Sequence, residues 1–238
     1  WRTLSKALDN AAQLALFEFD TPTILLMPEP TGGTATGARA AAKEALDAGA
    51  DLILGPLFAE EVSAVAPLAR QVNVPVVAFS SDSSVGGEGV HLLSFPLDED
   101  VERIVDYATL QGMTRFAALY PHGTYGDRVR AAFQQAVSAR AGEVVASAGY
   151  PSSPEGMYDP AQRLAAAYGD GNYHAVLLPE GGSELKSLAP LLPYYDVDPR
   201  EVKFLGTGLW DDPSLAREPP LNGAWFPAPP PEGHDQFL

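Results

Sequence analysis

Residues 51–84 constrain the fold more than any other stretch of this chain. They contain two short apolar runs, 52–54 and 76–79, and each run ends in small or polar residues. Between the runs, apolar residues recur at helical spacing, namely Val62, Val65, Ala66, Ala69 and Val72. The pattern predicts a strand, a helix and a second strand parallel to the first, because parallel strands need such a crossover. Pro67 lies inside the helical run and predicts a kink or a late helix start.

Both predicted strands are continuously apolar rather than alternating. This is typical of a parallel sheet with helices on both faces. In open sheets of this kind, ligands bind beyond the carboxyl ends of the strands. The residues that follow the two runs, 55–58 and 80–84, would lie at that edge. We therefore look for function in the loops that follow strands.

The rest of the chain continues the alternation of strand and helix. Helices are predicted at 4–19, 35–48, 98–111, 127–141, 160–168 and 183–192. Further strands are predicted at 23–27, 90–95, 115–120, 143–148, 174–178, 202–205 and 221–226. Local signals support several boundaries, since Thr34 or Thr36 suits a helix N-cap and Gly49 a C-terminal cap.

A break near residues 95–98 divides the alternation in two. The predicted fold class is α/β, with two similar lobes that are each a doubly wound parallel sheet. The first lobe covers 1–96 and the second covers 97–220. Residues 221–238 are predicted to be an inter-lobe crossing followed by a proline-rich, extended tail.

Composition excludes several classes of function. The formal net charge of −16 argues against nucleic acid and anionic membrane surfaces as partners. The absence of cysteine excludes disulfides, thiolate metal sites and cysteine catalysis. The four histidines are scattered without metal-ligand spacing, and no G-x-S-x-G motif occurs. No apolar run approaches the length of a membrane span. We expect no cofactor, no metal and no enzymatic activity.

Two segments taken in series resemble a known family. ADLILGPLFAEEVSAVAPLARQVNVPVVAFSSD and GMTRFAALYPHGTYGDRVRAAFQQAV resemble type I periplasmic binding proteins of the leucine/isoleucine/valine-binding group. Within that group the chain is most similar to the penicillin-binding-protein activators, which are outer-membrane lipoproteins with this fold in their C-terminal domain. The resemblance covers about residues 10–226.

The resemblance implies a two-lobed clamp with the ligand in the cleft between the lobes. It also implies a strand before the first helix and helices after Phe226, so the whole protein is expected to be longer than this chain. The expected location is the periplasm, with a tether to the outer membrane through an N-terminal lipid outside this segment.

The resemblance names candidate ligand-binding residues in the first lobe. The loop with Ser81, Asp82, Ser83 and Ser84 is where amino-acid-binding relatives hold the ligand carboxylate; otherwise the serines cap the next element. The charge of Asp82 opposes carboxylate binding unless its side chain points away. Phe58 either lines the cleft or packs in the interior.

Further candidates lie in the second lobe. The resemblance implies that Tyr120, Tyr125 and Tyr150 close over the ligand, whereas the alternative is packing at a lobe interface. It also implies that Glu184 pairs with a ligand ammonium group; the alternative is a carboxylate placed to suit the helix dipole. Asp211 and Asp212 are interpreted as turn caps.

The sequence suggests three alternative functions. The first, from the nearest resemblance, is a non-catalytic regulator that docks on a bifunctional peptidoglycan synthase, whose basic surface the acidic chain would suit. The second is the solute receptor of an ABC importer, with a small-molecule ligand such as a branched-chain or other amino acid, an ABC permease as partner, and hinge closure of the lobes. The third is an enzyme on an α/β sheet, which no group of residues supports.

Overall fold

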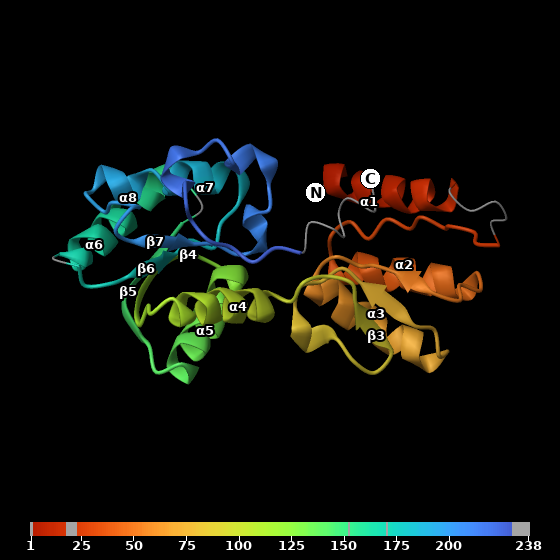
Figure 1. The fold of residues 1–238 in the computed structure, drawn as a ribbon. Coiled ribbons are helices and arrows are strands. Elements are labelled where there is room, and N and C mark those ends of the chain that lie inside the picture. Colours follow the sequence, from red (N-terminus) through yellow and green to blue (C-terminus); the bar gives the residue numbers. More distant parts are fainter. Residues whose placement is uncertain (1, 18–22, 152, 170, 230–238) are drawn as a thin grey trace. The chain divides into compact units, whose positions relative to one another are not determined.

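The structure is a computed structural model that describes residues 2–17, 23–151, 153–169 and 171–229. The chain divides into two compact units, unit 1 (Trp1–Pro96) and unit 2 (Leu97–Leu238). Each unit is an α/β arrangement around its own parallel sheet (Figure 1). The α/β fold class predicted from the alternation of strand and helix is therefore confirmed.

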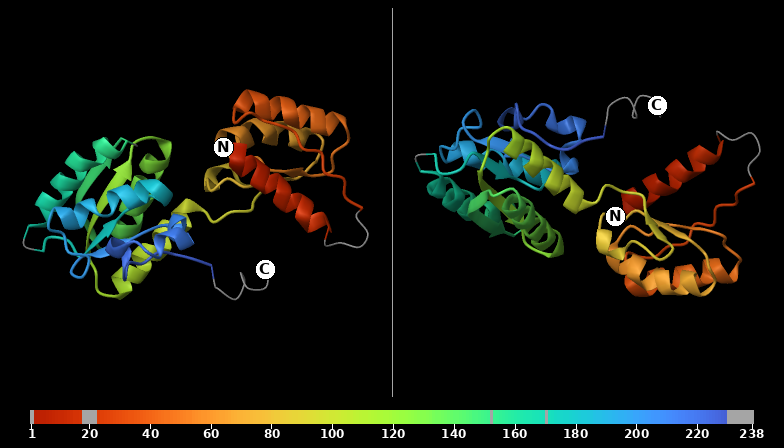
Figure 2. Two further views of the ribbon diagram at one scale, coloured as in Figure 1. Left: turned by 90° about the horizontal axis from the view of Figure 1, so that it is seen from above. Right: turned by 60° about the horizontal axis from the view of Figure 1, so that its bottom comes forward.

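Unit 1 has a sheet of three short parallel strands in the order β1-β2-β3. Its strands are β1 (Ile53–Leu54), β2 (Val76–Ala78) and β3 (Val90–Leu92), and its helices are α1 (Arg2–Phe17), α2 (Ala35–Asp47), α3 (Ala59–Gln71) and the 3-10 turn η1 (Ser83–Val85). The helices α2 and α3, drawn in orange, lie side by side in every view (Figure 2). They cover one face of the sheet with a core of alanine and valine, including Ala38, Val62 and Val76.

The caps of α2 follow the sequence signals. Thr34 is the N-cap and its side chain accepts a hydrogen bond from the amide of Gly37. Gly49 follows the C-cap with φ of +88°, a conformation that favours glycine. The helix α3 begins at Ala59, ahead of Pro67, so a late start at the proline is wrong.

One predicted strand of unit 1 does not form. Residues 23–27 have no strand assignment, and Ile24 and Leu25 are 60% and 83% exposed. A strand exists only through hydrogen bonds to a neighbour, and no described strand pairs with this segment. The strand β1 is at the edge of the sheet, and the lack of a neighbour on its outer side among the described strands leaves Leu54 half exposed. The helix α1 forms as predicted, but none of its residues 6–17 is buried, and residues 18–19 of that prediction lie outside the described part.

Unit 2 has a sheet of four parallel strands in the order β5-β4-β6-β7. The strands are β4 (Arg115–Pro121), β5 (Glu143–Tyr150), β6 (Ala175–Leu177) and β7 (Lys203–Leu205). The helices are α4 (Leu97–Leu110), α5 (Thr124–Ala139), α6 (Tyr158–Tyr168), α7 (Gly182–Leu188) and α8 (Leu191–Tyr194). The 3-10 turns are η2 (Pro154–Met157), η3 (Gly208–Trp210), η4 (Pro213–Leu215) and η5 (Pro219–Leu221).

Helices cover both faces of this second sheet. Along β4, Ala117 and Leu119 face a core that includes residues of α6, α7 and α8. The alternate residues Phe116, Ala118 and Tyr120 face a second core with α4 and α5. All these strand residues are fully or almost fully buried, which explains why the sequence run is continuously apolar.

Two predictions for unit 2 need correction. The helix predicted at 183–192 is broken into α7 and α8 at Pro190, which lacks the N–H that a continuous helix would need. The strand predicted at 221–226 is a single bridge, in which Trp225 pairs with Leu205, the last residue of β7. Residues 221–225 pack on the cores of unit 2. Most of the predicted tail, residues 230–238, lies outside the described part.

Candidate functional site

The carboxyl ends of four parallel strands bring polar side chains together in unit 2. The order β5-β4-β6-β7 means that the chain leaves β4 in one direction for β5 and returns on its other side for β6. The crossover helices α5 and α6 pack in different cores on opposite faces of the sheet, so the loops after β4 and β6 diverge, and ligands of open α/β sheets bind at such a point. Tyr125 follows β4, and Glu180 follows β6. This edge is the candidate site.

Glu180 is held in place by two aromatic residues. The backbone turns sharply after β6, where the amide of Glu180 donates to the carbonyl of Leu178 at 2.9 Å. The indole Nε1 of Trp210 donates to the Glu180 carbonyl at 2.8 Å and contacts that of Leu178 at 3.2 Å. The hydroxyl of Tyr150, at the end of β5, donates to Glu180 Oε1 at 2.9 Å. A residue at the end of β5 therefore binds the carboxylate, and a residue that follows β7 binds the backbone that carries it.

Glycine allows Trp210 to reach this position. A Cβ atom on Gly206, directly after β7, would lie 2.1 Å from the indole ring. The indole ring of Trp210 therefore packs directly against the backbone of Gly206, at the end of β7. Any larger residue at position 206 would displace the ring from the two carbonyl groups that it binds.

Two hydroxyl groups at the same edge are buried without a hydrogen-bond partner. They belong to Tyr125 and Thr207, and neither group has a partner of normal geometry among the described residues. Burial raises the pKa of Tyr125 to about 12, and the nearby Thr207 hydroxyl opposes that shift. Buried polar groups normally have partners; these two hydroxyls are close enough to partner each other, and each keeps further hydrogen-bonding capacity for a ligand or ordered water.

The charges around these hydroxyls are acidic. Burial raises the pKa of Glu180, although the Tyr150 hydroxyl lowers it, and the negative charge of Glu184 raises it further. Asp100, on α4, accepts a hydrogen bond from the amide of Gly208 at 2.9 Å. Burial raises the pKa of Asp100 as well. Such a site favours a ligand group that is positively charged or donates hydrogen bonds.

The structure brings three of the predicted residues together. They are Tyr125, Tyr150 and Glu184. Burial is the main cause that raises the pKa of Tyr150, and Glu180, Tyr125 and Glu184 raise it further. Glu184 is exposed in the first turn of α7, where Ser183 donates to its Oε2 at 2.8 Å. Tyr120 belongs to the core formed with α4 and α5, against which Tyr125 also packs, and the charge that affects its pKa is that of Arg130 rather than that of Glu180 or Glu184. Asp212 caps η4 by accepting from the Ser214 amide at 2.8 Å, as interpreted from the sequence.

A one-residue bulge decides this separation of Tyr120 and Tyr150. The register shifts after Phe116, so that Pro121 pairs with Tyr150 and Tyr120 pairs with Gly149. If β5 paired with β4 without this shift, Tyr150 would be level with His122 and would face the same side of the sheet as Tyr120.

The serine loop of unit 1 is a capped turn. Asp82 is the N-cap of η1, and its Oδ1 accepts from the amide of Ser84 at 3.0 Å and from its hydroxyl at 2.6 Å. Ser80 is buried, and its Oγ accepts from the amide of Asp82 at 3.1 Å. The Asp82 carboxylate thus turns toward its own turn. Ser81, Ser83 and Ser84 remain candidate carboxylate ligands, while the interaction of Ser84 with Asp82 supports the capping alternative.

Phe58 is the N-cap residue of α3 in unit 1. Its amide donates to Glu61 Oε2 at 3.3 Å. Glu61 is only 2% exposed, and its other oxygen has no hydrogen-bond partner among the described residues. This buried acid at a strand-end loop is a further candidate that the sequence reading did not single out.

The sequence reading also missed Glu180, Trp210, Thr207 and Asp100. Glu180 follows a predicted strand by two residues, so the strand-end rule could have selected it in place of Glu184. Asp100 lies in the first turn of α4, where an acidic residue is already accounted for by the helix dipole. Its contact with Gly208 joins positions 108 residues apart, and no local pattern reports such a contact.

The described residues contain no group of three or more His, Cys, Asp or Glu side chains placed to hold a metal ion. Within the same residues, every helix is too short or too polar to cross a membrane.

Comparisons with known proteins agree with this architecture. A family model described as periplasmic binding protein matches residues 2–237. A search of curated proteins finds no match.

Many solved structures match the chain. One is a solute-binding protein of an ABC transporter from Rhodopseudomonas palustris BisB5 in complex with 3,4-dihydroxybenzoic acid, with TM-score 0.70 and 22% identity over 90% of this chain and 60% of that one. Another is an ABC transporter substrate-binding protein from Sphaerobacter thermophilus, with TM-score 0.71 and 19% identity over 82% of this chain and 54% of that one.

A third is a branched-chain amino acid ABC transporter periplasmic ligand-binding protein from Burkholderia xenovorans LB400. It has TM-score 0.63 and 17% identity over 74% of this chain and 48% of that one. This chain spans between about half and 60% of the length of these three proteins. At these identities the likeness is one of fold, and the family match covers nearly the whole chain. The chain belongs to the periplasmic binding protein family.

Proposed function

We propose that this chain is part of the solute receptor of an ABC importer and that it acts by binding, without catalysis, in the periplasm. The observation that carries the proposal is the strand-end site of unit 2, where the half-buried carboxylate of Glu180 lies near the buried hydroxyl of Tyr125, which neighbours that of Thr207. The solved structures described above support this choice, since all three are solute-binding or ligand-binding proteins of ABC transporters. The partner would be an ABC permease.

The chemistry of the site narrows the ligand class. Glu180, Glu184 and Asp100 favour an ammonium group or another strong hydrogen-bond donor. The hydroxyls of Tyr125 and Thr207 would complete the contacts to that group. An amino acid is the small solute that meets this need best, because its ammonium group would pair with these carboxylates. A simple aromatic acid would meet only acidic groups at the unit 2 edge, so we place it second.

A binding experiment tests the proposal. Titration calorimetry of the full chain with a panel of L-amino acids, benzoate and 4-hydroxybenzoate should give saturable heat for at least one amino acid. Glu180→Gln should weaken that binding about tenfold or more, because a charge-assisted hydrogen bond is lost. Glu143→Gln, at the opposite end of β5, is the matched control and should bind as the unaltered chain does.

A second pair of variants tests the hydroxyl contacts. Tyr125→Phe removes a buried hydroxyl and should also weaken binding, whereas Tyr194→Phe, at an exposed position, should not. Absence of heat and of thermal stabilisation with every compound would refute the receptor proposal. Binding to a purified peptidoglycan synthase in the same samples would then favour the regulator that the sequence resemblance suggested.

A further inference from the structure

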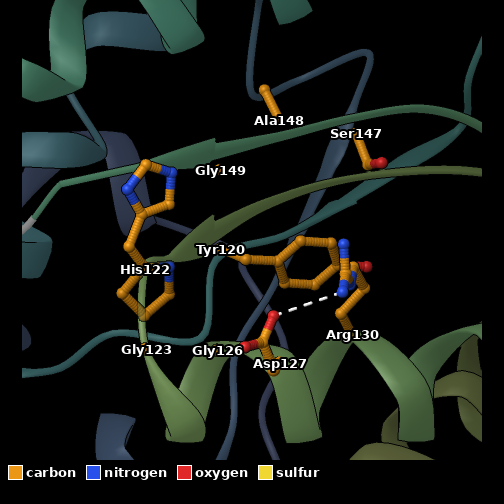
Figure 3. A pocket seen from close by; sticks show the side chains of 10 residues that line it. Tyr120, His122, Gly123, Gly126, Asp127, Arg130, Ser147, Ala148 and Gly149 are labelled. Carbon is orange, nitrogen blue, oxygen red and sulfur yellow. Dashed lines mark hydrogen bonds and ion pairs between the residues drawn. The ribbon is translucent and has the colours of Figure 1, made fainter.

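Unit 2 has a cavity of about 470 Å³ that is separate from the strand-end site just described. It lies between the edge strand β5 and the first turns of α5, and Figure 3 shows the side chains that surround it. Tyr120 forms one wall, on the face of the sheet opposite to the Tyr150 hydroxyl group that binds Glu180. Tyr120 and Tyr150 therefore face different sides of the sheet, although Tyr125 of the strand-end site packs against the same core as Tyr120.

The cavity is bounded by groups that suit an anion. Arg130 and the ring of His122 flank Tyr120 on opposite sides, and the hydroxyl of Ser147 points in from β5 (Figure 3). The guanidinium of Arg130 contacts Asp127 at 3.2 Å through one nitrogen. Such an exposed pair between residues three apart on a helix is weak, and a guanidinium has further N–H donors for a ligand.

A buried hydroxyl is the second, independent observation at this cavity. Tyr120 is only 4% exposed, and its hydroxyl has no hydrogen-bond partner among the described residues. In Figure 3 that hydroxyl points toward the guanidinium of Arg130. Buried hydroxyls without partners are uncommon in proteins, so this wall of the cavity has a hydrogen bond left to make.

Glycines keep the cavity open. A Cβ atom on Gly149 would lie 2.8 Å from His122 Nε2, so the imidazole occupies space that any other residue would take. A Cβ atom on Gly126 would lie 1.7 Å from the carbonyl oxygen of Pro121, so the first turn of α5 packs directly on the end of β4. The bulge in β5 places Ser147 and Gly149 in register with Ala118 and Tyr120, on the side that faces α5.

We propose that this cavity is a second binding site, for a small organic monocarboxylate. Arg130 and Ser147 bind the carboxylate, and the carbon skeleton lies against the rings of Tyr120 and His122. The carboxylate also displaces Asp127 as the partner of Arg130. Because Asp127 stays at the rim and the chain carries a net charge of −16, a monoanion is favoured over a phosphate dianion.

Amide NMR spectra of the full chain titrated with sodium benzoate, sodium acetate and inorganic phosphate test the proposal. Benzoate should shift the amides of Gly123, Gly126, Ser147 and Gly149 as one saturable group. Acetate should shift the same amides with weaker affinity, because it lacks ring contacts, and phosphate should bind most weakly of the three.

Variants separate this site from the site at Glu180. Arg130→Gln should weaken benzoate binding about tenfold, because it removes the charge-assisted contact. Arg128→Gln removes the same charge from the same helix outside the cavity and should leave the affinity unchanged. Gly149→Ala should reduce binding by pushing the imidazole into the cavity, and Glu180→Gln should have no effect on these shifts.

Three results would overturn the proposal. They are the absence of saturable shifts at the cavity amides, equal losses in Arg130→Gln and Arg128→Gln, and benzoate shifts confined to the edge with Tyr125 and Glu180. A different result would refute the receptor proposal, namely that no solute binds at the edge with Tyr125 and Glu180.

Discussion

The hydrogen bond between Tyr150 and Glu180 should stabilise unit 2 in a pH-dependent way. Tyr150 is fully buried, and its hydroxyl donates to Glu180 Oε1 at 2.9 Å. Tyr150→Phe removes the donor and leaves a half-buried carboxylate. Bonds to charged groups contribute about 1.5–3 kcal/mol, and partial exposure of Glu180 reduces this to about 1–2 kcal/mol.

The pH dependence has a definite sign. Burial raises the pKa of Glu180 above 4.5 in the folded state, and the Tyr150 hydroxyl opposes that rise. An acid with a raised folded pKa reduces stability as pH rises from its unfolded value through its folded value. Loss of the hydroxyl raises the pKa of Glu180 further, so the penalty of Tyr150→Phe should be largest near pH 7.5 and smaller below about pH 4.

Urea unfolding followed by tryptophan fluorescence measures this effect, since Trp210 and Trp225 both belong to unit 2. A double-mutant cycle with Glu180→Gln isolates the interaction, and we expect a coupling of about 1–2 kcal/mol at neutral pH. Tyr168→Phe is the matched control, because its hydroxyl bonds an exposed acid, Glu201, at 3.3 Å. Equal losses at both pH values and in both backgrounds would refute the reasoning, because they would assign the loss to packing alone.

Three further predictions concern unit 2. Gly206→Ala should lower the free energy of unfolding by about 1–3 kcal/mol and shift tryptophan fluorescence, because a Cβ at 2.1 Å displaces the Trp210 ring; an unchanged spectrum would contradict this. Burial raises the pKa of Asp100 above 3.8, so the unaltered chain should lose stability relative to Asp100→Asn as pH rises above about 4. Urea unfolding at several pH values measures this, and a difference in unfolding free energy that does not change with pH would refute it. Arg140 bridges Glu102 and Asp106 with a side chain that is 17% exposed, so Arg140→Gln should cost about 1 kcal/mol at low salt and less at high salt in thermal unfolding. Arg200→Gln is the control, because that side chain is 89% exposed, and it should not change the stability measurably in the same thermal unfolding assay.

The candidate site lies in strand-end loops, where the sequence led us to look, and its particular residues were less predictable. Tyr125, Tyr150 and Glu184 were selected from the sequence, and the structure places them near Glu180. Glu180 itself was passed over because a carboxylate two residues after a strand has no local signature of burial. Its role depends on Trp210 and Tyr150, which come from other strands.

The identity of the ligand could not be predicted from the sequence for a related reason. Hydrogen-bonding groups in the serine loop of unit 1 and in the edge of unit 2 are set by turns within each unit. What they bind depends on charges that meet only in space, such as Asp100 beside Gly208.

The sequence by itself determined the alternation of helix and strand, the division near residue 96 and the caps of α2, because periodicity and capping depend on neighbours a few residues apart. Tertiary structure alone decided which strands pair, and within the described part of the chain no strand pairs with residues 23–27 despite their strand-like composition. It also decided which face each tyrosine occupies, since one bulge residue in β5 separates Tyr120 from Tyr150. Strand pairing and register depend on hydrogen bonds between distant segments, and a shift of one residue reverses the face of every side chain that follows.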